Sequence, residues 1–85
     1  MASKAGEVQA MGARHCLIII EGNGEANYSA YSPDVPDVAA TGSSQEDCER
    51  EMRQAIAFHL EGLARGGESV PEPRSTASYA VVDLA

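Results

Sequence analysis

Tryptophan is absent from this sequence of 85 residues, Phe58 is its only phenylalanine, and aromatic residues make up only 5% of it. Much of the 44% hydrophobic fraction is alanine, so the core is predicted to be aliphatic and thin. A single domain of this size buries only about 60–65% of the surface of its unfolded chain. Small cores are often supplemented by association between chains. A homo-oligomer, a dimer or a tetramer, is therefore expected.

Long apolar runs and cysteine frameworks are also missing. No run of about 18 apolar residues is present, which excludes a membrane span, and no apolar segment follows Lys4 as a signal peptide would require. Cys16 and Cys48 are too few for a disulfide framework and are predicted to be small buried hydrophobes. These absences predict a cytoplasmic protein.

Basic residues are scarce. The chain has 6 Lys and Arg against 13 Asp and Glu, a net charge of −7, and residues 15–85 hold four arginines against twelve acids, a net of −8. Such a surface repels the phosphates of nucleic acids and attracts basic partners, although the simpler interpretation is a solubilising charge. Direct nucleic-acid binding is not expected.

Residues for catalysis are not gathered in any recognisable motif. The sequence shows no zinc-site spacing, no nucleophile elbow and no phosphate loop. His59 is best interpreted as a core histidine, and Asp34 and Asp37 as turn formers. Neither cofactor nor metal is predicted, and the favoured interpretation is a protein that is not an enzyme. A small enzyme using His59 or the Asp34/Asp37 pair remains an alternative.

Turn signals gather in residues 33–47. Pro33 and Pro36 each fix their own φ and push the residue before them into extended geometry, which predicts a turn. Gly42 ends a short extended segment, and the Ser43-Ser44 pair followed by acidic residues is typical of a helix start. Strands are expected at residues 16–20, 28–32 and 38–41, the first of them buried on both faces.

A helix over residues 44–65 is the strongest periodic signal. Seven residues fall within one arc of the helical wheel: Cys48, Met52, Ala55, Ile56, His59, Leu60 and Leu63. Gly66-Gly67 suits the C-cap, and residues 78–84 are predicted to form a last strand. The predicted fold is α+β with the order β-β-β-α-β: a three-stranded antiparallel meander, a parallel fourth strand in the sheet order 3-2-1-4, and one helix on one face. Residues 1–13 are predicted to be a flexible extension, Met11 could be an internal start, and residues 14–85 form the domain.

Three blocks resemble the HicB family of antitoxins over about residues 15–84: the turn 33–37, the helix start 42–48 and the exit 67–73. Asp37 stands where the family usually has glycine, Ser44 where it has threonine and Cys48 where it has alanine. The residues that carry the structural part of the resemblance are Pro33, Pro36, Gly42, Ser44, Asp47, Gly67, Pro71 and Pro73.

The resemblance implies an antitoxin that binds and neutralises a small basic HicA-like toxin, which cleaves mRNA. Relatives often continue into a DNA-binding domain, and this sequence ends at Ala85 before one, so operator binding is not expected. An orphan domain that binds another protein or itself is the alternative. The acids expected to contact a basic partner are Asp34, Asp37, Glu46, Glu49 and Glu72.

Overall fold

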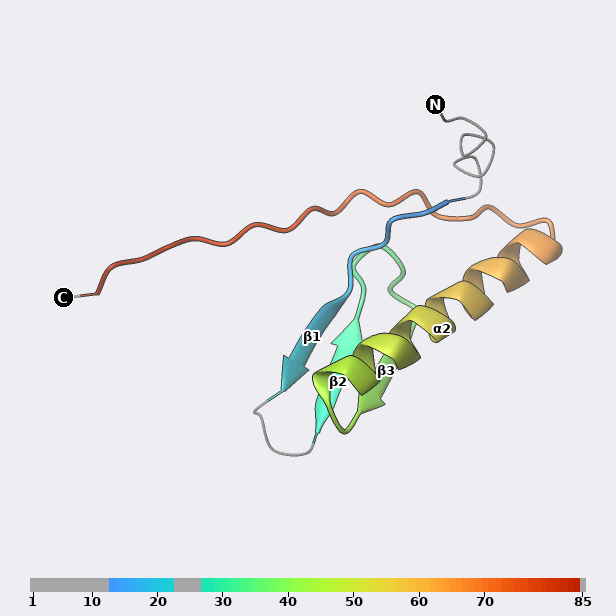
Figure 1. Ribbon diagram of the computed structural model, residues 1–85. Coiled ribbons are helices and arrows are strands. Elements are labelled where there is room, and N and C mark those ends of the chain that lie inside the picture. The colour runs from blue at the N-terminus through green and yellow to red at the C-terminus, as the bar shows by residue number, and fades with distance from the viewer. Residues whose placement is uncertain (1–12, 23–26, 85) are drawn as a thin grey trace, which may run out of the picture.

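Three strands and one helix build the protein, as seen in a computed structural model that describes residues 13–22 and 27–84 (Figure 1). In chain order they are β1 (Ile19–Gly22), β2 (Tyr28–Tyr31), β3 (Ala39–Gly42) and α2 (Gln45–Arg65). Residues 1–12 of the predicted extension lie outside the described part, as do residues 23–26.

The sheet is an antiparallel meander with the order β1-β2-β3, which confirms the predicted first half of the fold. Side chains alternate between its two faces along each strand. Ile20, Ala30 and Ala40 are aligned across the strands and pack toward the helix. The neighbouring row, aligned in the same register, belongs to the opposite face and consists of Ile19, Tyr31 and Ala39.

Local hydrogen bonds fix where α2 begins. Ser44 has extended geometry at φ −142° and ψ 167°, and its Oγ accepts the backbone N–H of Asp47 at 3.0 Å. The Oγ of Ser43 donates to the carboxylate of the same Asp47 at 3.0 Å. The predicted N-cap is therefore confirmed at Ser44, one residue before the first helical residue.

Glycine fixes where α2 ends. Gly67 has a φ of +75°, a conformation that other residues adopt only with strain. Its N–H donates to the carbonyl of Ala64 at 3.1 Å, and the N–H of Glu68 donates to the carbonyl of Leu63 at 2.9 Å. These two bonds make a Schellman motif, which satisfies carbonyls that the helix itself leaves unpaired.

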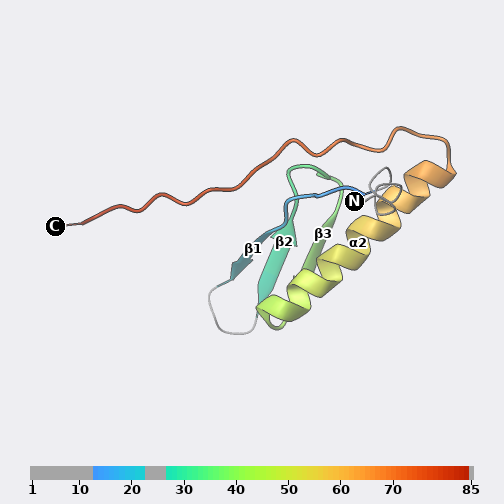
Figure 2. The same cartoon turned by 45° about the horizontal axis from the view of Figure 1, so that its top comes forward.

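The core lies between the sheet and α2, which crosses one face of the sheet (Figure 2). Met52 and Cys48 have no exposed surface, and Val35 of the turn between β2 and β3 is 1% exposed. Two turn hydrogen bonds, from Val35 N to Ser32 O and from Val38 N to Val35 O, both of 3.2 Å, aim Val35 inward. The proline-rich turn is thus part of the core as well as a connection.

The prediction of a fourth strand is wrong for the described residues. Residues 66–84 leave the end of α2 in an extended form and pair with no strand (Figure 1). Most of the large apolar side chains near their end are almost fully exposed, with Tyr79 at 95%, Val81 at 94% and Leu84 at 89%. We call residues 76–84 the C-terminal tail.

The position of the first strand also differs from the prediction. It begins at Ile19, lies at an edge of the sheet instead of in the middle, and none of its residues is buried. The physical reason is that no strand within residues 13–22 and 27–84 covers its outer edge. Cys16, predicted to be buried, lies before the strand and is half-buried, whereas Cys48 is buried as expected.

Candidate partner-binding site

A junction around Asp34 joins three distant parts of the chain. Its carboxylate accepts the backbone N–H of Leu17 at 3.0 Å, of Arg74 at 2.9 Å and of Ser75 at 3.0 Å. The N–H of Asp34 itself donates to the Oγ of Ser32 at 3.2 Å. The turn thereby holds both the segment that leads into β1 and the segment that leads into the C-terminal tail.

These hydrogen bonds favour the charged form of Asp34. The N–H of Leu17, followed by that of Arg74, lowers the pKa of the carboxyl below its usual 3.8, while partial burial opposes them. Asp34, predicted to contact a partner, is thus occupied with backbone donors of its own chain. A carboxylate that accepts several backbone N–H groups serves mainly to stabilise the fold.

A second contact between the two ends of the domain lies beside this junction. The guanidinium of Arg14 donates from Nε to the carbonyl of Pro71 at 3.4 Å and lies 3.5 Å from the carboxylate of Glu72. The side chain of Glu72 is 74% exposed, so this ion pair is worth little in stability. It still leaves Glu72 accessible to a partner.

The five predicted contact acids do not form one patch. Asp34 and Asp37 lie in the turn that joins β2 to β3, with Glu72 near that turn. Glu46 and Glu49 follow the other end of β3, in the first turns of α2. The four residues of β3, a length of about 13 Å, separate the two groups.

Arginines on α2 are paired with acids of the same helix. Arg50 pairs with Asp47, Arg53 with Glu49, and Arg65 with Glu61. These pairs are exposed and contribute modestly to the helix. Their main consequence is electrostatic, because each arginine's charge is balanced by its acidic partner. The remaining exposed acids of α2, such as Glu46 and Glu51, therefore make the charge of the helix surface negative.

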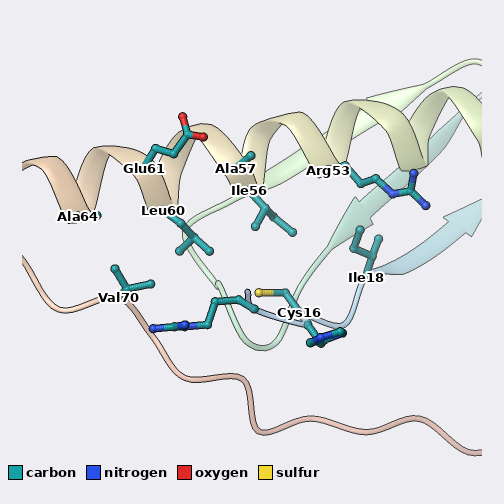
Figure 3. A pocket seen from close by; sticks show the side chains of 11 residues that line it. Cys16, Ile18, Arg53, Ile56, Ala57, Leu60, Glu61, Ala64 and Val70 are labelled. Carbon is teal, nitrogen blue, oxygen red and sulfur yellow. The ribbon is translucent and has the colours of Figure 1, made fainter. Parts of the chain in front are cut away.

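An apolar groove runs between the second half of α2 and the chain that leads into β1. Its volume is about 700 Å³, and Figure 3 shows Ile56 and Leu60 of α2 facing Cys16 and Ile18 across it, with Val70 at one end. Its complete lining is Arg14, His15, Cys16, Ile18, Arg53, Ile56, Ala57, Leu60, Glu61, Ala64 and Val70. Most of the walls are apolar, which suits an apolar occupant better than a charged one.

The groove does not have the chemistry of an active site. Burial, and then the negative charge of Asp34, raise the pKa of the Cys16 thiol above 9.0 against the opposing effect of Arg14, so little thiolate forms near pH 7. His59, half-buried on α2, is not among the residues that line the groove. In the described part of the chain, no three His, Cys, Asp or Glu residues are grouped as a metal would require. Nothing in this geometry favours the enzyme alternative.

The face of the sheet opposite α2 is a further exposed surface. Tyr31 is 44% exposed there and lies between Ile19 and Ala39 in the register. Beside this apolar row runs a polar one, of Glu21, Ser29 and Thr41. Aromatic residues with polar neighbours are common in protein interfaces.

Sequence reasoning did not find the groove. The residues that line the groove come from three separate segments of the chain. The helical wheel places Ile56 and Leu60 in the apolar arc of the helix, but it does not show that part of this arc extends past the sheet. The length of the predicted helix, compared with strands of four to five residues, was the available signal. A helix that is longer than its sheet leaves apolar side chains uncovered at one end.

Comparison with known proteins assigns the family. Residues 16–82 match the family described as HicB-like antitoxin of bacterial toxin–antitoxin systems. The match spans most of the chain, and the protein belongs to this family of antitoxins. No curated protein and no solved structure was found to match the chain. Among the residues described, no helix is long and apolar enough to cross a membrane.

Proposed function

We propose that this chain neutralises a toxin by binding a small, basic, HicA-like protein that cleaves mRNA. The observation that carries the proposal is the match to the antitoxin family over residues 16–82. The excess of acids over residues 15–85, a net charge of −8, supports it, because an acidic surface speeds encounter with a basic partner and adds specificity. Binding of this kind needs no catalytic residue in the antitoxin itself.

The acids proposed for the contact are not equivalent in the structure. Asp37 and Glu46 are exposed, and Glu49 and Glu72 are accessible beside their arginines. Asp34 is held by the backbone, so we expect its replacement to act on the fold before it acts on the partner. Asp37 and Glu46 are therefore the acids whose replacement tests binding most cleanly.

The experiment is co-expression with any small basic reading frame that adjoins the gene, followed by purification of the complex. Growth should be restored and the two proteins should co-purify. In stopped-flow mixing, added salt should slow association sharply and change dissociation less, because steering acts on encounter. The double variant with Asp37→Asn and Glu46→Gln should associate more slowly, and Gln54→Ala, at an exposed position outside the groove lining, is the control. A neighbour that stays toxic and forms no complex would end the antitoxin proposal and leave an orphan binding domain.

Self-association is proposed alongside toxin binding, as a dimer or a tetramer. Its support is the thin core together with four large apolar side chains of the tail that are more than two-thirds exposed, namely Tyr79, Val81, Val82 and Leu84. Apolar surface of this extent on one short segment is typical of an interaction site.

A further inference from the structure

We infer that two copies of this chain exchange their C-terminal tails, each tail adding a strand to the free outer edge of β1 and covering the apolar groove of the other copy. The inference rests on the proposed self-association and is independent of toxin binding. The segment involved is the last part of the tail, Tyr79–Leu84, and its receptor is residues 16–22 together with the groove beside them.

The receptor has an unpaired edge and an apolar wall. Among the residues that the structure describes, β1 pairs with β2 on one side only, so its other edge offers backbone donors and acceptors to an incoming strand. Beside this edge, Cys16 and Ile18 face Ile56 and Leu60 across the groove (Figure 3). A strand laid along the edge would place alternate side chains over this apolar wall.

The tail has the composition and the length that this receptor requires. Tyr79 and Val81 alternate with Ala80 and Val82, so both faces of the strand it would form are apolar. Six extended residues span about 20 Å, and the seven residues 16–22 span about 23 Å. The family match runs to Val82, so most of this segment belongs to the domain itself.

The junction explains why the occupant is a second copy. The N–H groups of Leu17, Arg74 and Ser75 all donate to Asp34, so the segment that leads into the chain's own tail is held at the turn after β2. Beyond Ser75 the tail runs away from β1 and past the sheet in both views (Figures 1 and 2). In the described chain the outer edge of β1 is thus left unpaired and the end of the tail is left exposed. In a dimer with a twofold axis, each tail pairs with the β1 edge of the other chain.

The test compares variants of the full chain whose altered side chains are exposed, so folding should be retained. Val81→Lys places a charge in the tail, and Ala57→Glu places one on the groove wall, where Ala57 is exposed. Ser69→Lys and Gln54→Glu are matched controls at exposed positions outside the groove lining. Circular dichroism should show the same helix content in all five proteins.

Sedimentation at about 1–100 μM, a range typical of specific association, should show the wild type and both controls at twice the 8.9 kDa chain mass. Each tail or groove variant should dimerise about a hundredfold more weakly or worse, because the dimer holds two equivalent tail–groove contacts and one buried valine is worth about tenfold in each. An equimolar mixture of Val81→Lys and Ala57→Glu should regain dimers, because one intact tail then meets one intact groove.

Three results would overturn the inference. A wild type that is monomeric throughout the range refutes both tail exchange and self-association, and co-purification still decides toxin binding separately. A Val81→Lys variant that dimerises as well as wild type refutes tail exchange and leaves self-association through another surface, such as the face that carries Tyr31. Folded variants whose mixture stays monomeric show that the tail and the groove are not each other's partners.

Discussion

The carboxylate of Asp34 accepts the backbone N–H of Ser75 at 3.0 Å, across 41 positions of the chain. Together with the N–H of Leu17 and of Arg74, this bond joins the entry to the sheet, the turn after β2 and the start of the tail. At this junction one ionised side chain holds the C-terminal segment to the rest of the domain, which is the role predicted for a fourth strand. Both the fold and its response to pH depend on it.

Asp34→Asn is expected to remove a pH dependence of stability. The pKa of Asp34 is lower in the folded chain than its usual 3.8, so its contribution is complete above that pH and is lost as the pH falls through the folded pKa. Urea unfolding at pH 7, 4 and 3 should show the wild type losing free energy of unfolding between pH 4 and pH 3, and the variant losing less. Asp37→Asn, at an exposed position of the same turn, should follow the wild type. If the free energy of unfolding of Asp34→Asn falls with pH as steeply as that of the wild type, the role of Asp34 in holding the junction is contradicted.

Ser44→Ala should lower the free energy of unfolding by roughly 0.5–2 kcal/mol, because it removes the oxygen that caps the N–H of Asp47. Ser43→Ala removes only an exposed bond to the carboxylate of Asp47 and should stay within about 0.5 kcal/mol of wild type. Chemical denaturation of both variants measures the difference. Equal losses at the two serines would show that the cap is shared between them.

Two glycines at the C-terminal end of α2 should respond to alanine with opposite signs. Gly62 has open space where the Cβ of an alanine would lie, so Gly62→Ala should raise the free energy of unfolding by about 0.5–1 kcal/mol. Gly67 has a φ of +75°, so Gly67→Ala should lower it by about 1–2 kcal/mol. Thermal unfolding followed by the circular dichroism of the helix should give melting temperatures on either side of wild type. The prediction is wrong if both shift in the same direction.

Met52→Ala should cost about 2–5 kcal/mol, since its side chain has no exposed surface and the cavity left behind would be central. Phe58→Ala, at a side chain that is 78% exposed on the same helix, should change stability by less than about 0.5 kcal/mol. If Met52→Ala does not fold, Met52→Leu should fold and lose less than about 1.5 kcal/mol. A larger loss at Phe58 than at Met52 would contradict the assigned packing of α2.

The sequence predicted the elements that depend on local signals. Ser44 and Gly67 set the bounds of α2 through bonds within a few residues, and the proline turn set the path from β2 to β3. The prediction of a fourth strand failed because composition shows that residues 78–84 can form a strand but not whether another strand lies within reach, and in the described chain they pair with none. From the sequence, Asp34 is predicted to be a turn former and a partner contact, since a carboxylate that accepts backbone N–H groups at positions 17, 74 and 75 leaves no local trace in the sequence.

The position of the core within the chain has a consequence for synthesis. In the described residues, every buried side chain lies between Ala30 and Ile56. The strands pair only with their neighbours in sequence, a low contact order that permits folding on the order of milliseconds. The C-terminal tail contributes none of these buried side chains, so the core needs only the part of the chain that is made before it.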